Sequence, residues 1–145
     1  MNKNVFISGA SRGIGRAIAY HFANNNYVVV GTSRNEFEFD QKNENLIPLK
    51  LDVTSRDDVA ECFEMLKSKD LLPKILINNA GITSDQIFLR MKYEDWDNVI
   101  NTNLNGVFNL SKIFVKNMIK HKEGRIINIS SISGLMGNPG QVNYS

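Results

Sequence analysis

The feature that most constrains the fold of this chain is a series of short runs of consecutive apolar residues. Each run is followed by a turn or by a segment with helical periodicity. The runs cover residues 5–8, 27–30, 46–51, 75–77 and 125–129. Most of them are apolar along their length and do not alternate with polar residues, which is typical of strands buried on both faces of a parallel sheet. We therefore predict an α/β fold, in which a doubly wound parallel sheet is the middle layer of a Rossmann-type three-layer α/β/α sandwich.

The segments between these runs predict the covering helices. A first helix follows residue 13 and ends at residues 24–26, a second begins after Thr54 or Ser55, and a third spans roughly residues 93–120. The polar connection 34–45 is interpreted as a loop, with Phe37 and Phe39 in a short, poorly formed helix.

Chain length, net charge and cysteine count limit the class of protein. A chain of 145 residues suits one domain, residues 1–145, and a net charge of +2 gives no argument for nucleic-acid binding. No apolar run approaches the roughly 18 residues of a membrane span, and the first residues leave no room for a signal peptide. The single cysteine, Cys62, fits a reducing compartment and is interpreted as a packing residue. We expect a cytoplasmic protein, with no metal site because His21 and His121 lack partners at ligand spacing.

A glycine-rich turn separates the first apolar run from the first helix. Its residues are Gly9, Ala10, Ser11, Arg12, Gly13, Ile14 and Gly15. Glycine permits close approach of the backbone to a pyrophosphate, and the helix N-terminus directs free N–H groups at it. The spacing is not G-x-G-x-x-G, so a tight turn without a ligand stays open as the alternative.

The end of the second run distinguishes between two nicotinamide cofactors. Folds that bind NAD place a carboxylate there for the ribose 2′-hydroxyl, but here no acidic residue occurs before Glu36. Arg34 and Arg12 are suited to bracket a 2′-phosphate, since guanidinium groups bind phosphate well. We therefore predict NADP(H) as the cofactor, with a solvated Arg34 in a loop as the alternative.

Taken together, the motifs resemble those of the short-chain dehydrogenase/reductase family. Besides the glycine turn, the matching elements are Asp52-Val53, Asn78-Asn79-Ala80-Gly81, Asn103, and Ser131 with Tyr144 thirteen positions later. The resemblance implies cofactor contacts from Gly9, Ser11, Arg12, Gly13, Ile14, Gly15, Arg34, Asp52, Val53, Asn79, Ala80 and Gly81. All five elements occur in the family's order along the chain.

The resemblance also implies a catalytic set. Tyr144 would be the general acid, Ser131 would hydrogen-bond the substrate oxygen, and Asn103 would hold a water that supplies protons. A free tyrosine has a pKa of about 10, and the family lowers it with a lysine four residues later. Without the resemblance, Ser131 reads as a strand-end hydroxyl, Asn103 as a surface residue of a helix and Tyr144 as an interface residue.

A narrower resemblance is to bacterial 3-oxoacyl-[acyl-carrier-protein] reductases. It is carried by residues 80–85, 90–92, Trp96, 124–131 and 134–144. It implies NADPH-dependent reduction of 3-oxoacyl-[acyl-carrier-protein] to the (3R)-3-hydroxyacyl form in fatty-acid elongation, by a homotetramer. The basic residues Lys116, Lys120, Lys122 and Arg125 are interpreted either as complements to a helix dipole or as a docking surface for acidic carrier protein.

The family's lysine falls at position 148, beyond Ser145, as do its remaining strands and helices. We therefore interpret the chain as the N-terminal portion of a single-domain enzyme, with the C-terminal part missing. The 145 residues alone are expected to be inactive, with the fifth strand as an exposed edge. The alternatives are a truncated, non-catalytic nucleotide-binding remnant and a family reductase that acts on another ketone or alcohol.

Overall fold

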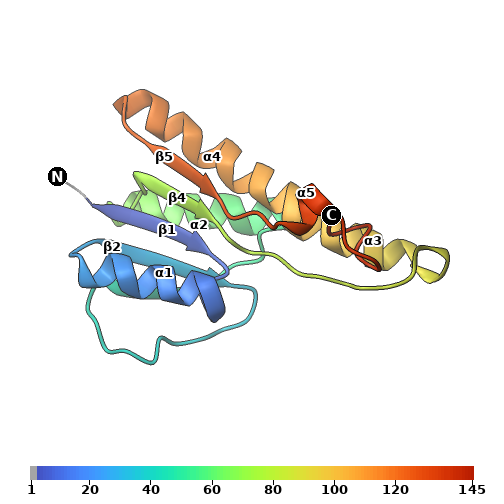
Figure 1. The fold of residues 1–145 in the computed structure, drawn as a ribbon. Coiled ribbons are helices and arrows are strands. Elements are labelled where there is room, and N and C mark those ends of the chain that lie inside the picture. Colours follow the sequence, from blue (N-terminus) through green and yellow to red (C-terminus); the bar gives the residue numbers. More distant parts are fainter. Residues whose placement is uncertain (1–2) are drawn as a thin grey trace.

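Five parallel strands form a single sheet in the computed structural model, which describes residues 3–145 (Figure 1). The strands are β1 (Asn4–Ser8), β2 (Val28–Ser33), β3 (Leu46–Lys50), β4 (Ile75–Asn78) and β5 (Arg125–Asn128). Their spatial order is β3-β2-β1-β4-β5. Strands β2 and β3 are therefore added on one side of β1, and β4 and β5 on the other, so the strand order reverses between β1 and β4. This confirms the predicted doubly wound α/β fold, and β2 extends three residues beyond the predicted run.

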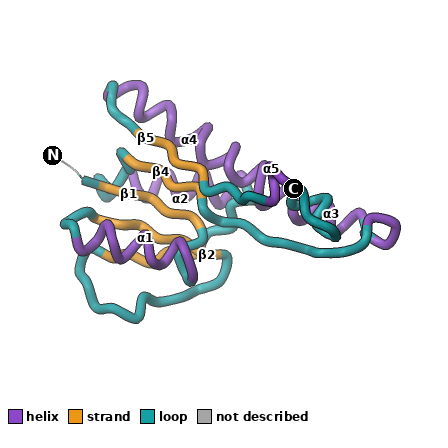
Figure 2. Tube along the Cα trace, viewed as in Figure 1, coloured by secondary structure: helices purple, strands orange, loops and turns teal. Residues whose placement is uncertain are grey.

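Helices connect the strands except between β2 and β3, where the connection is a loop (Figure 2). They are α1 (Gly13–Asn24), α2 (Arg56–Ser68), α3 (Tyr93–Ile100), α4 (Gly106–His121) and α5 (Ser133–Met136), with a 3₁₀ turn at Phe88–Arg90 and a π turn at Asn101–Asn105. Ser55, not Thr54, caps α2, because its Oγ accepts a hydrogen bond from the N–H of Asp58 at 3.2 Å. Within residues 3–145, no helix combines the length and apolar character needed to cross a membrane.

The central strand β1 contributes side chains to two separate cores, one on each face of the sheet. Val5 and Ile7 belong to the core that α1 covers. Phe6 points to the other face and packs against α2 and α4, with its ring centroid 4.9 Å from that of Phe114. This burial on both faces explains why the run is apolar at successive positions.

The two edge strands differ from the interior ones. β3 contains Pro48, which lacks the N–H that a further strand would use and is therefore tolerated at an edge. β5 forms the other edge, and all four of its residues are exposed, as expected for this strand. Ile126 and Ile127 remain 38% and 43% exposed, so part of an apolar sheet face is uncovered here.

The prediction of a short helix around Phe37 and Phe39 is wrong. The segment that follows β2 is irregular, with Phe37 and Phe39 half-buried and Glu36 and Glu38 exposed. This alternation has a period of two, which suits an extended segment lying on a surface and does not suit a helix.

Burial makes Cys62 unreactive. The side chain lies in the core between α2 and α4, and burial raises the pKa of the Cys62 thiol to about 12. At pH 8 we expect iodoacetamide to alkylate the native protein at least about 100-fold more slowly than the protein unfolded in urea, because only the thiolate reacts. Mass spectrometry of timed samples measures both rates, and equal rates would contradict the burial of Cys62.

Asn78, at the end of β4, ties this strand to two neighbours. Its Nδ2 donates to Asn128 Oδ1 at 2.8 Å and to Ser111 Oγ at 3.1 Å, and the residue is 2% exposed. We expect Asn78→Ala to lower the free energy of unfolding by about 2–3 kcal/mol, and Ser111→Ala, the matched control, by about 1 kcal/mol. Urea titration of both variants measures the difference, and an equal loss would show that the bond to Asn128 contributes nothing.

Candidate functional site

The carboxyl ends of β1 and β4 are joined by hydrogen bonds at the point where the strand order reverses. Ser8 Oγ accepts from the N–H groups of Asn79 and Ala80, both at 3.0 Å. Asn79 Nδ2 donates to the carbonyl oxygens of Ser8 at 3.1 Å and Gly9 at 2.9 Å. These bonds hold the glycine turn against the segment after β4, at the place where open α/β sheets bind their ligands.

The glycine turn brings the N-terminus of α1 to this crevice. Gly9 has a φ of +70°, and a Cβ there would lie 2.8 Å from the Cα of Ala80, so a larger residue would push the two segments apart. Arg12 occupies the N-cap position without a side-chain capping bond. The first N–H groups of α1 are therefore free of a side-chain cap and suited to bind an anion.

A hollow of about 340 Å³ extends from this turn past the ends of β2 and β3. Of the residues predicted to contact a cofactor, those that line it are Gly9, Ser11, Arg12, Gly13, Ile14, Arg34, Asp52, Val53, Asn79, Ala80 and Gly81. Gly15 lies behind the turn, where a Cβ would collide with the carbonyl of Gly9 and the side chain of Asn79. Gly15 therefore allows the backbone of α1 to pack closely against the glycine turn and does not line the hollow.

The end of the hollow beside β2 is cationic. Arg12 and Arg34 both line it, and Arg34 is exposed. Asp52, from the loop after β3, is the only carboxylate in the lining, and its Oδ1 already accepts from the N–H and hydroxyl of Thr54 at 2.9 and 2.7 Å. Neither guanidinium group forms an ion pair with a described residue, so the hollow is suited to a phosphate.

A second hollow, of about 720 Å³, adjoins the first and shares lining residues with it, among them Arg12 and Gly81. Ser131 and Tyr144 line it from the segments after β5. Ser131 Oγ accepts a hydrogen bond from the N–H of Ser133 at 3.2 Å, which leaves the hydroxyl proton free to be donated. Within the described residues the Tyr144 hydroxyl has no hydrogen-bond partner, so both hydroxyls can be directed at a ligand in the hollow.

Asn103 lines the same hollow from the π turn between α3 and α4. Its Oδ1 accepts from the N–H of Ile82, and its Nδ2 donates to the Ile82 carbonyl, each at 2.9 Å. The side chain therefore fastens the long helical stretch to the segment after β4. A π turn inside a helix often occurs at a functional site, because it changes the local hydrogen-bond pattern.

Three polar residues that shape the site belong to none of the sequence motifs. Ser8 joins β1 to β4. Thr32 is 1% exposed and lines the first hollow, and its hydroxyl has no hydrogen-bond partner among residues 3–145. Asn143 is 5% exposed and donates to the carbonyls of Ser84 and Asp95 at 3.1 and 3.2 Å, which positions the neighbouring Tyr144. An isolated polar residue carries no sequence signal for burial, so only the fold identifies these three.

The basic residues at the end of α4 lie away from both hollows. Lys122 follows the helix in the left-handed region, with a φ of 54°, and is exposed. Glu123 pairs with Lys74 at 2.6 Å. The Lys120 and Lys122 charges complement the helix dipole, and they also remain accessible to a partner. Residues 3–145 contain no group of three or more His, Cys, Asp or Glu that could hold a metal ion.

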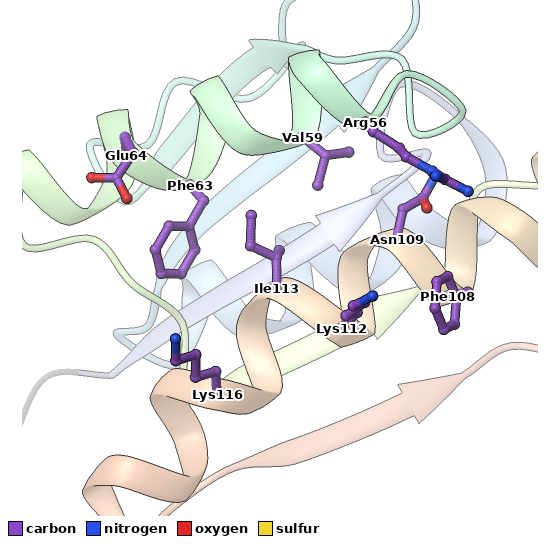
Figure 3. Close-up of a pocket in the computed structure, with 9 residues that line it drawn as sticks. All are labelled: Arg56, Val59, Phe63, Glu64, Phe108, Asn109, Lys112, Ile113 and Lys116. Atoms are coloured by element: carbon purple, nitrogen blue, oxygen red, sulfur yellow. The ribbon is translucent and has the colours of Figure 1, made fainter.

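A third hollow, of about 670 Å³, lies between α2 and α4 (Figure 3). Its floor is apolar, with Val59, Phe63 and Ile113, and Lys112 and Lys116 stand on its rim. None of the predicted site residues lines it. We therefore assign the candidate site to the carboxyl edge of the sheet.

Comparisons with known proteins identify the family of the chain. A family model described as short chain dehydrogenase matches residues 3–145. The chain is 43% identical to the 3-oxoacyl-[acyl-carrier-protein] reductase FabG of Thermotoga maritima, over 99% of this chain and 61% of that protein. It thus spans about three fifths of the length of the curated relative.

Solved structures give the same result. The structure of ElxO with NADP bound is 38% identical with a TM-score of 0.91, and covers 99% of this chain and 61% of its own. The structure of 4-hydroxyisoleucine dehydrogenase complexed with NADH is 33% identical with a TM-score of 0.88, over 99% and 62%. With a family model that matches nearly every residue and motifs that line one continuous crevice, the chain belongs to the short-chain dehydrogenase family.

Proposed function

We propose that the protein is an NADPH-dependent oxidoreductase that reduces 3-oxoacyl-[acyl-carrier-protein] to (3R)-3-hydroxyacyl-[acyl-carrier-protein] in fatty-acid elongation. One observation carries the proposal. Ser131 and Tyr144, from the end of the chain, line a hollow that continues into the hollow at the glycine turn. A ligand that fills both would place its reactive end beside two hydroxyl groups.

The first hollow fits a nicotinamide dinucleotide that carries a 2′-phosphate. The uncapped N-terminus of α1 suits the pyrophosphate. Arg12 and Arg34 suit the 2′-phosphate. Similar structures bind either cofactor, since ElxO binds NADP and 4-hydroxyisoleucine dehydrogenase binds NADH. For this chain, the two arginines favour NADP(H).

The second hollow suits the reduction of a ketone. When bound, NADPH supplies the hydride. Ser131 then donates a hydrogen bond to the substrate oxygen, a contact worth about 3 kcal/mol where charge develops on that oxygen. Tyr144 donates the proton to the same oxygen. Asn103 would keep a water in place for the return of protons, and residues 1–145 alone, which lack the lysine that the family places at position 148, are expected to be inactive.

The choice of substrate rests on relatives. FabG of Thermotoga maritima is named for its action on acyl-carrier-protein thioesters. The exposed Lys122 and its basic neighbours suit an acidic carrier protein, and a homotetramer of the full-length protein belongs to the same proposal. An assay with acetoacetyl-[acyl-carrier-protein] tests the substrate, and activity confined to free ketones or polyols would favour a family reductase with another substrate.

Replacement of Arg34 tests the cofactor choice. In the full-length gene product, Arg34→Asp should weaken NADPH binding at least about tenfold and improve NADH binding, since a carboxylate repels the 2′-phosphate and accepts from the 2′-hydroxyl. Nucleotide fluorescence titrations measure both dissociation constants, with Arg90→Asp, at an exposed arginine outside both hollows, as the control. An unchanged preference for NADPH over NADH in Arg34→Asp would show that Arg34 does not contact the 2′-phosphate.

Replacement of Tyr144 tests the catalytic assignment. Tyr144→Phe should lower kcat for the ketone about 10²–10⁴-fold without changing NADPH affinity, because only the proton donor is lost. Tyr93→Phe removes the same hydroxyl from a tyrosine that is 87% exposed and should leave kcat unchanged. A Tyr144→Phe variant that retains full activity would show that another group donates the proton.

A further inference from the structure

The loop between β2 and β3, which begins with Arg34, lacks helix and strand but is fastened to the rest of the molecule. Phe37 and Phe39 point inward and pack on the core under α1, with 5.1 Å between their ring centroids. Phe39 also lies 5.9 Å from the ring of Tyr20, in α1. Such aromatic contacts hold a segment in place without a hydrogen-bonded ladder.

Phe39 lies over a glycine in β2. A Cβ on Gly31 would lie 2.6 Å from Phe39 Cζ and 2.8 Å from the Cβ of Ala10, in the glycine turn. The N–H of Ala10 also donates to the carbonyl of Thr32 at 2.8 Å. Gly31 therefore allows the loop, the strand and the glycine turn to meet at one point, with the phenyl ring as the cover.

Asp40, one residue beyond Phe39, is tied to α1. Its carboxylate pairs with the guanidinium group of Arg16, and its N–H donates to the Tyr20 hydroxyl at 3.1 Å. Arg16 and Tyr20 are spaced four residues apart and therefore share one side of α1. The loop is thus attached to α1, whose N-cap residue, Arg12, lines the hollow.

These contacts leave Arg34 on a short span between two anchors. On one side the carbonyl of Ser33 accepts from the N–H of Leu51 at 2.8 Å, and on the other Phe37 is packed in the core. We infer that Phe39 is a positioning residue, which, with Tyr20 and Asp40, holds Arg34 at the hollow that Arg12 also lines and thereby determines the preference for a cofactor with a 2′-phosphate. This inference rests on the proposed cofactor.

The physical reason is preorganisation. If the ring of Phe39 is lost, Phe37 and Asp40 still tie the loop to the core and to α1, but the segment that carries Arg34 is held less firmly and must be ordered further each time a cofactor binds. That cost falls on contacts with the 2′-phosphate alone. NADH, which lacks this phosphate, binds the same crevice without using Arg34.

The test compares NADPH and NADH dissociation constants in the full-length gene product. Phe39→Ala should weaken NADPH binding about tenfold and leave NADH binding within about twofold, whereas Phe39→Leu should retain most of the preference. Phe63→Ala is the matched control, because it truncates another half-buried phenyl group, on α2, far from the loop. It should lower stability and leave the ratio of the two constants unchanged.

A double variant separates this inference from the proposal beneath it. In an Arg34→Asp background, Phe39→Ala should change the ratio no further, since the positioned group is gone. An unchanged preference in Arg34→Asp alone would overturn the proposed cofactor and the inference with it. A changed preference in Arg34→Asp with none in Phe39→Ala, or an equal loss of both nucleotides in Phe39→Ala, would overturn the positioning role alone.

If Phe39→Ala does not fold, Tyr20→Phe takes its place. This variant removes only the hydroxyl that accepts from Asp40 and keeps the ring that packs on Phe39. We expect the same direction of change with about a twofold shift in the ratio of the dissociation constants. An unchanged ratio in this variant would then overturn the inference.

Discussion

The hydrogen bonds between the ends of β1 and β4 are the constraint on which the candidate site depends. At the point where the strand order reverses, the side chain of each of Ser8 and Asn79 forms a hydrogen bond with the backbone of the other. A crevice opens there because the chains leaving the two strands turn to opposite faces. The bonds keep Gly9 and Ala80 in contact, so the N-terminus of α1 and the segment after β4 form two walls of one hollow.

The second part of the site is assembled from segments far apart in the chain. Asn103 fastens the π turn to Ile82, and Asn143 fastens the residue before Tyr144 to Ser84 and Asp95. Ile82 and Ser84, whose backbone groups they bond, lie outside helices and strands. Side-chain amides therefore fasten two of the segments that line this hollow, including the one that carries Tyr144.

Much of the fold was predictable because β1 and its neighbours are buried on both faces. A strand such as Val5–Ser8 needs apolar residues at successive positions, and this local pattern is visible in the sequence. The glycine turn was equally visible, since its backbone geometry excludes side chains. The loop after β2 differs from the predicted short helix because Phe37 and Phe39 pack on the core under α1, and only the folded chain shows which distant helix holds an irregular segment.

The sequence by itself determined the order of strands and helices, the family and the set of residues at the carboxyl edge, since each follows from a local pattern or a motif. Only the tertiary structure decided which polar residues are buried and what they bind. Ser8, Thr32 and Asn143 look like ordinary loop or strand residues until the chain is folded. The physical reason is that burial and hydrogen-bond partners are properties of segments brought together from distant parts of the chain, which no single segment encodes.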